Sequence, residues 1–182
     1  MIESYNLVRL ESNYKLKPFD CDDSDLNEFY EKDSLNYLKQ LFAVTYIFEE
    51  KNKAIAFYSV SNDKIAISDS KNISKNRWKM KIQKNLPHPK RRYSFPAVKI
   101  GRLGVCKQKQ GLGLGTEILD FIKASFTYKN KTGCRFIVVD AYNKENVIEF
   151  YQKNGFDILP SKIEENDITV LMYYDLLRFR IE

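Results

Sequence analysis

Three glycines stand at alternate positions, 111, 113 and 115, in the stretch QKQGLGLGTEIL (108–119), although the whole chain of 182 residues has only 7 glycines. Glycine loses more backbone entropy on folding than any other residue, so the clustering needs a structural reason. A strand-like segment precedes the glycines and a helical pattern follows them. The first turn of a helix offers unpaired N–H groups and the positive end of the helix dipole. The spacing therefore indicates a turn at which a phosphate group can approach the backbone.

Two common phosphate-binding motifs do not fit this turn. A P-loop requires a Gly-Lys-Ser/Thr ending, and no lysine stands at that place. A dinucleotide fingerprint requires a third glycine, but Thr116 and Ile118 occupy the two positions where it could stand. The turn therefore predicts a phosphate ligand of another kind.

Side chains for nucleophilic or metal-assisted chemistry are scarce. The single histidine, His88, lies in the proline-rich stretch PHPKRRYSFP (87–96). The three cysteines, Cys21, Cys106 and Cys134, are far apart and lack the paired spacing of zinc sites. We therefore expect free thiols and no metal, and the composition disfavours a Ser-His, Cys-His or zinc mechanism.

The positive charge is local. The chain has a net charge of +6 at pH 7, yet residues 70–116 contain 13 Lys or Arg and no Asp or Glu. An acid-free segment beside a glycine-rich turn indicates an anionic partner, and a solvated basic loop is the alternative.

The composition is that of a globular protein, with 43% hydrophobic and 30% charged residues. No apolar run has the length of a membrane span, and the N-terminal residues lack the regions of a signal peptide. We expect a cytoplasmic protein in which residues 1–182 form a single domain with no membrane contact.

Hydrophobic periodicity predicts a mixed α/β sheet flanked by helices with right-handed crossovers. The expected strands are 5–11, 42–50, 54–62, 95–105, 134–140, 156–160 and 168–177, and the expected helices are 22–41, a short one around Trp78, 114–128 and 143–155. The glycine turn then joins a strand to a helix.

Two segments in this order resemble the GNAT acetyltransferases. The first, VKIGRLGVCKQKQGLGLGTEIL, resembles the family signature Gln/Arg-x-x-Gly-x-Gly/Ala, with Gln110, Gly113 and Gly115 in place. The second, NVIEFYQKNGF (146–156), is similar to Ala-x-x-Phe/Leu-Tyr-x-x-x-Gly-Phe, with Tyr151 in place and Val147 for the usual alanine. The expected element order is that of the GNAT fold, so the resemblance extends over nearly the whole chain.

The resemblance implies acetyl-CoA as co-substrate. In the family, the preceding strand pairs with the pantetheine arm and the loop amides hold the pyrophosphate. The implied pantetheine residues are Leu103, Gly104 and Val105, and the implied pyrophosphate cradle is Gln110, Gly111, Leu112, Gly113, Leu114, Gly115 and Thr116. The family often has an asparagine where Lys144 stands, which leaves Asn143 or Asn146 as the candidate cofactor contact.

The resemblance also assigns the chemistry. An amine attacks the thioester carbonyl, whose oxygen the Val105 amide polarises, and the CoA thiolate leaves. Tyr151 is the implied general acid, because a phenol with a pKa of about 10 can protonate a thiolate whose acid has a pKa of about 8.5.

The acceptor follows from a missing base. Many GNAT enzymes carry a glutamate on the strand before the loop, but 95–105 contains no acid. A lysine amine, with a pKa of about 10.4, needs such a base, whereas an α-amine near about 8 does not. A weakly basic amine carried on a polyanion is aminoacyl-tRNA, and Lys90, Arg91 and Arg92 are candidate phosphate contacts.

The N-terminal half agrees with this acceptor. FDCDDSDLNEFYEKDS (19–34) and GRLGV (101–105) resemble the tRNA-acetylating toxin branch of the family, whose members have a small antitoxin partner and are often dimers. Two alternatives stay open. One is acetylation of a small amine or a protein N-terminus. The other is a module that binds acyl-CoA or RNA without turnover.

Changing Lys90, Arg91 and Arg92 together to alanine is expected to weaken RNA binding and to flatten its salt dependence by about 0.7 per lost contact in single-stranded regions. Acetyl-CoA affinity, measured alongside, is expected to stay unchanged, because backbone amides elsewhere in the chain hold that ligand. Acetylation of aminoacyl-tRNA at the wild-type rate at both low and moderate salt would contradict the phosphate assignment and favour a small amine.

Overall fold

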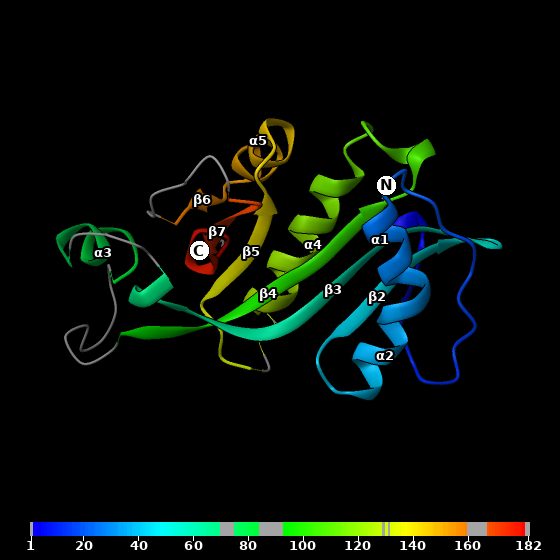
Figure 1. Cartoon of the computed structure of the whole chain (residues 1–182), viewed down its shortest axis with the longest axis horizontal. Helices are drawn as coiled ribbons and strands as arrows, with labels where there is room; N and C mark the ends of the chain where they lie inside the picture. Colours follow the sequence, from blue (N-terminus) through cyan, green and yellow to red (C-terminus); the bar gives the residue numbers. More distant parts are fainter. Residues whose placement is uncertain are drawn as a thin grey trace. The chain divides into compact units, whose positions relative to one another are not determined.

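The computed structural model describes residues 2–69, 75–83, 93–128, 130, 132–159 and 167–180. Within them the strands form a seven-stranded mixed sheet in the order β1-β2-β3-β4-β5-β7-β6 (Figure 1). The strands are β1 (Asn6–Arg9), β2 (Val44–Glu50), β3 (Lys53–Ala66), β4 (Ser94–Val105), β5 (Phe136–Tyr142), β6 (Asp157–Ile158) and β7 (Thr169–Asp175). The expected mixed α/β class is confirmed.

The helices follow the sequence pattern closely. They are α1 (Ser24–Glu28), a π-helical turn η2 (Phe29–Asp33), α2 (Ser34–Lys39), α3 (Lys75–Lys81), α4 (Leu114–Tyr128) and α5 (Glu145–Lys153). Short 3₁₀ turns are η1 (Ile2–Ser4), η3 (Ile67–Asp69), η5 (Lys107–Lys109) and η6 (Leu176–Arg178). None of the helices in the described ranges is long and apolar enough to cross a membrane.

The chain divides into two compact units, Met1–Asn62 with Lys99–Ser125 and Asp63–Val98 with Phe126–Glu182. Each unit is described by itself below. The expectation of a single domain over 1–182 stays a prediction.

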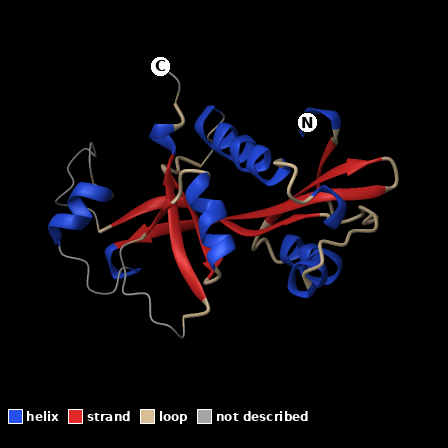
Figure 2. Ribbon diagram, turned by 90° about the horizontal axis from the view of Figure 1, so that it is seen from above, coloured by secondary structure: helices blue, strands red, loops and turns tan. Residues whose placement is uncertain are grey.

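In the first unit, helices cover both faces of an antiparallel β1-β2-β3 ribbon (Figure 2). On one face, Phe57 of β3 contacts the rings of Phe19, Phe29 and Tyr30. On the other face, Phe48 of β2 meets Phe121 of α4, with ring centroids 5.9 Å apart. These alternating strand residues fix which helix lies on which face.

The segment predicted as one helix over 22–41 has a π-helical turn in its middle. Asp23 caps its start, since its carboxylate accepts a hydrogen bond from the Leu26 amide at 3.0 Å. The neighbouring aromatics Phe29 and Tyr30, at the start of the π turn, are both buried. Hydrophobic periodicity alone does not distinguish this turn from an α-helix. A single π-helical turn adds less than one residue to the α-helical repeat.

In the second unit, α3 packs on the sheet through a cluster of buried side chains that includes residues of β3, β4, β5 and β7. Its members are Ile65, Trp78, Ile82, Phe95, Ala97, Phe136, Val138, Leu159 and Tyr173. The short helix expected around Trp78 is confirmed. Strand β7 pairs antiparallel with β5 and β6, and α5 is followed by Phe156, which packs against Tyr174 of β7.

The turn after α5 requires glycine for two separable reasons. Gly155 has φ +80°, and a Cβ there would lie 3.0 Å from the Tyr174 ring. Gly133 also has a positive φ, +70°, but a Cβ there would have no atom within 4 Å. Gly133→Ala therefore isolates the backbone cost, and Gly155→Ala adds the steric one.

We expect Gly133→Ala to lower the free energy of unfolding by about 1–2 kcal/mol, the cost of a left-handed backbone with a Cβ. Gly155→Ala is expected to lower it further, because Tyr174 is buried and cannot move away freely. Urea denaturation of both variants measures the difference. Equal losses would show that the Tyr174 ring gives way without cost.

Candidate active site

The glycine turn of the first unit connects β4 to α4 as the sequence predicts. Gly111 and Gly113 have φ +73° and +83°, and a Cβ at either position would have no atom within 4 Å. The glycines are therefore required by backbone conformation, and the space beside them is open to a ligand. Gly115 differs, since it lies inside the first turn of α4.

The start of α4 supplies amide donors. The Glu117 N–H donates to the Gly113 carbonyl at 3.2 Å, so the amides of Leu114, Gly115 and Thr116 precede the first intrahelical bond. Thr116 is exposed, whereas the Leu114 side chain is buried beneath the helix. This arrangement favours an anion at the helix N-terminus.

Hydrogen bonds from elsewhere in the first unit anchor the turn. The Gln110 Nε2 amide donates to the carbonyls of Cys21 at 2.8 Å and Val105 at 3.0 Å. The backbone amides of Cys106 and Lys107 donate to the carbonyls of Ile55 and Asp20. The Gln110 side chain therefore holds the loop against the protein, a role that the signature motif alone does not reveal.

Cys21 provides the far end of this anchor. Its thiol is buried and donates to the Asn27 Oδ1 atom at 3.2 Å. Burial raises the pKa of the Cys21 thiol above its ordinary value, so the thiol stays protonated at neutral pH. Cys106 and Cys134 are also free and buried, but they flank β4 and β5 and are not within the strands.

Gly104 of β4 has a steric role that the sequence did not reveal. A Cβ there would lie 2.7 Å from the Phe57 ring and 3.2 Å from the Phe19 ring. The Phe57 ring is buried and held by neighbouring rings, so it cannot give way freely. Leu103 and Val105, on either side of Gly104, are partly exposed.

An acidic side chain from another element lies beside β4. The Asp25 carboxylate of α1 lies 3.4 Å from the Arg102 Nε atom of β4. The Arg102 guanidinium also lies over the Phe29 ring, 5.3 Å from its centroid. The sequence of the strand does not reveal this acid, whose only signal is the Asp-rich start of the first helix.

Tyr151 lies in the second unit, on the buried side of α5. The residue is 7% exposed, and its ring contacts Phe150 and Phe156 at centroid distances of 5.2 and 5.3 Å. Burial raises the pKa of the Tyr151 phenol well above its ordinary value, so it stays protonated at neutral pH. This shift moves its pKa further from that of a thiol than the sequence alone suggests.

The remaining predicted site residues have different outcomes. The Asn143 Nδ2 amide donates to the Asp167 carbonyl at 3.0 Å and its backbone N–H donates to Ile168, so Asn143 holds the start of β7. Its cofactor contact stays a prediction.

Lys90, Arg91 and Arg92 lie outside the described residues. Within the described ranges, no three His, Cys, Asp or Glu side chains are grouped to hold a metal ion.

Comparison with known proteins identifies the architecture. Residues 82–158 match the family model described as an acetyltransferase (GNAT) domain. A tRNA-acetylating toxin of Mycobacterium tuberculosis (strain ATCC 25618 / H37Rv) is 24% identical over 144 residues, which are 79% of this chain and 78% of that protein.

Two solved structures of the toxin AtaT share the fold. One is a tyrosine-to-phenylalanine mutant bound to the C-terminus of the antitoxin AtaR and acetyl-CoA, with TM-score 0.69, 17% identity and coverage of 96% of this chain and 94% of that one. The other is AtaT complexed with acetyl-methionyl-tRNAfMet, with TM-score 0.67, 20% identity and coverage of 96% of each chain. The GNAT resemblance and the GNAT fold expected from the sequence are confirmed.

Two substitutions at Gly113 separate backbone strain from charge. Asn and Asp have the same shape, and both tolerate a positive φ better than other side chains. We expect Gly113→Asn to weaken acetyl-CoA binding moderately and Gly113→Asp to abolish it, because the carboxylate faces the pyrophosphate. Calorimetry with acetyl-CoA measures both. Equal affinities for the two variants, with the fold intact, would remove the pyrophosphate from this turn.

Proposed function

Because residues 82–158 match the GNAT acetyltransferase domain and the fold is that of GNAT toxins, we propose that this chain transfers the acetyl group of acetyl-CoA to the α-amine of an aminoacyl-tRNA. The observation that carries the proposal is the open, glycine-formed turn at the N-terminus of α4. It offers backbone amides to a pyrophosphate without a blocking side chain.

In this proposal the cofactor lies along the first unit. The backbone of Leu103, Gly104 and Val105 pairs with the pantetheine arm, and residues 110–116 hold the pyrophosphate. The Gln110 anchor supports this role, since it ties the loop to the end of β4. The Val105 amide polarises the thioester oxygen and stabilises the negative charge that develops on it.

The amine then attacks the thioester carbonyl and loses its proton to water, while the carbon–sulfur bond breaks and the CoA thiolate takes the Tyr151 proton. The buried phenol is protonated at neutral pH, as a proton donor must be. Its raised pKa makes the transfer to a thiolate, whose acid has a pKa of about 8.5, unfavourable in the free protein. The transfer therefore depends on contacts to the tyrosinate that form with bound substrates.

Three features support aminoacyl-tRNA as the acceptor. Strand β4, SFPAVKIGRLGV, carries no acid of its own, and the Asp25 carboxylate beside it is paired with Arg102, which suits an amine that needs no strong base. The acid-free segment over 70–116 suits a polyanion. One relative, 24% identical, is a tRNA-acetylating toxin, and AtaT has been solved with acetyl-methionyl-tRNAfMet.

The partners and the location follow from this role. We propose a small antitoxin protein as a partner, since AtaT has been solved with the C-terminus of one. A homodimer and a cytoplasmic location, where both substrates are made, belong to the same proposal. Three free, buried thiols agree with a reducing compartment.

The test is release of CoA thiol from acetyl-CoA with a mixed aminoacyl-tRNA pool as acceptor. We expect turnover that rises with pH through the α-amine pKa of about 8 and then levels off. Deacylated tRNA and a lysine peptide serve as controls. Turnover with a small amine or a peptide N-terminus alone would move the acceptor to that class, and binding without turnover would make the chain a binding module.

Replacing Tyr151 with phenylalanine keeps the ring packing and removes only the hydroxyl. We expect kcat to fall by roughly 10²–10⁴, the loss typical of a missing general acid, with acetyl-CoA affinity little changed. Single-turnover kinetics and calorimetry separate the two effects. Normal turnover by the variant would make Tyr151 a packing residue and assign the proton to another group.

A further inference from the structure

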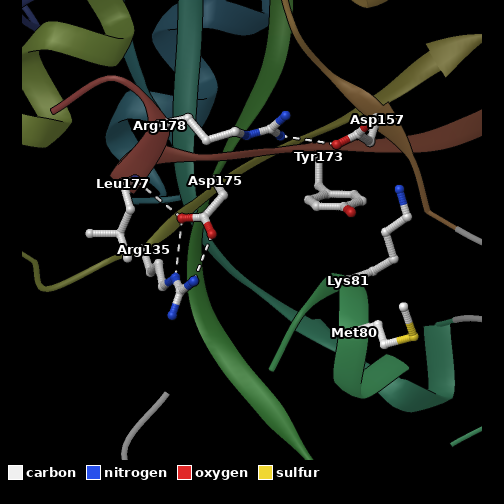
Figure 3. Close-up of a pocket in the computed structure, with 8 residues that line it drawn as sticks. All are labelled: Met80, Lys81, Arg135, Asp157, Tyr173, Asp175, Leu177 and Arg178. Atoms are coloured by element: carbon white, nitrogen blue, oxygen red, sulfur yellow. Dashed lines mark hydrogen bonds and ion pairs between the residues drawn. The ribbon is translucent and has the colours of Figure 1, made fainter. Parts of the chain in front are cut away.

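The second unit contains a cavity of about 370 Å³ that the proposed reaction does not use (Figure 3). It lies between the end of α3, the chain entering β5, β6, and the end of β7 with η6. Neither Tyr151 nor Asn143 lines it. Its volume is in the range of about 300–1,000 Å³ that small-molecule sites occupy.

Two ion pairs form part of its wall. The Arg135 guanidinium holds Asp175 through two bonds, Nε to Oδ1 at 3.1 Å and Nη2 to Oδ2 at 2.6 Å, with each side chain 17% exposed. Arg178 lies 3.1 Å from the Asp157 Oδ2 atom, with each side chain 43% exposed. Both carboxylates are therefore already neutralised by arginines, and the pairs hold the guanidinium groups in fixed positions.

Among the described lining residues, Lys81 gives the cavity one more cation than carboxylates. It is an exposed residue in the last turn of α3, and its side chain extends into the space lined by Tyr173 and Asp157 (Figure 3). In the part of the chain that the structure describes, no carboxylate lies within ion-pair distance of its ammonium group. The lining residues that the structure describes therefore have a net positive charge and donors available to an anion.

The other lining residues suit an anion attached to an apolar or planar group. The Tyr173 ring contributes to the wall, and burial raises the pKa of its phenol to about 12, so the hydroxyl remains a neutral donor. Met80 and Leu177 also line the cavity, and they are 76% and 48% exposed. Exposed apolar side chains beside a cationic cavity can bury part of the apolar surface of a nucleoside.

We propose that this cavity binds the phosphate group of a nucleotide, with Lys81 and Arg178 as the cationic contacts and Met80 and Leu177 against the attached nucleoside. A phosphodiester carries one negative charge and a phosphomonoester such as AMP carries up to about two, and the described lining residues have an excess of one cation. The phosphate belongs to the RNA substrate or to a free nucleotide. The RNA source rests on the proposed function, whereas the free nucleotide does not.

Lys81→Gln tests the site, with Lys79→Gln as its matched control. Both lysines are exposed on the last turn of α3, but Lys79 does not line the cavity. The probes are a labelled single-stranded RNA ending in CCA, followed by anisotropy at several salt concentrations, and AMP, followed by calorimetry. Melting temperatures confirm that both variants fold.

If the phosphate comes from RNA, Lys81→Gln lowers RNA affinity several-fold. It also makes the plot of log K against log salt less steep by about 0.7, whereas Lys79→Gln leaves that slope unchanged. The KM for aminoacyl-tRNA then rises while kcat stays constant. If AMP affinity falls and RNA affinity does not, the ligand is a free nucleotide. Equal effects of the two lysines, or no effect on either probe, would overturn the cavity as a site.

The proposed function has a separate readout in the same experiment. Wild-type protein that binds the probes through Lys81 but does not acetylate aminoacyl-tRNA would refute the proposed reaction and retain the phosphate site. Acetylation of aminoacyl-tRNA by the wild-type protein, together with unchanged probe binding by Lys81→Gln, would refute the phosphate site and retain the proposed reaction.

Discussion

The turn between β4 and α4 depends on left-handed backbone at Gly111 and Gly113, and the rest of the first unit is arranged to hold that turn. The chain cannot keep such a conformation by local preference alone, because glycine is equally free to leave it. The bonds from Gln110, Cys106 and Lys107 to three distant carbonyls supply the missing restraint. The two glycines, although of the most flexible residue type, therefore keep one conformation in this turn.

A second constraint comes from the aromatic cluster beneath β4. The Phe57 ring stands so close to Gly104 that any side chain there would displace the ring or the strand. Phe57 is itself held by Phe19 and Tyr30, which belong to the segment before and within the first helical region. The N-terminal helices therefore fix the position of the strand on which the pantetheine arm is proposed to lie.

Much of the fold was accessible from the sequence, because periodicity reports burial directly. The helix after the glycines ends at Tyr128, and a short helix surrounds Trp78, both as predicted. Bonds between distant residues were not accessible. The pairs Gln110–Cys21 and Arg135–Asp175 join residues 89 and 40 positions apart. The types of these residues do not reveal that they pair. The same limit concealed Asp25 and the cavity of the second unit.

The anchor at Cys21 has a consequence for an enzyme that would release a free thiol at every turnover. Disulfide exchange requires a thiolate, and burial keeps the Cys21 sulfur protonated and away from solvent. The oxidised dimer of the released coenzyme would therefore react slowly with this residue. The position of the glycine turn therefore does not depend on the redox state of its surroundings, although the residue that anchors Gln110 carries a thiol.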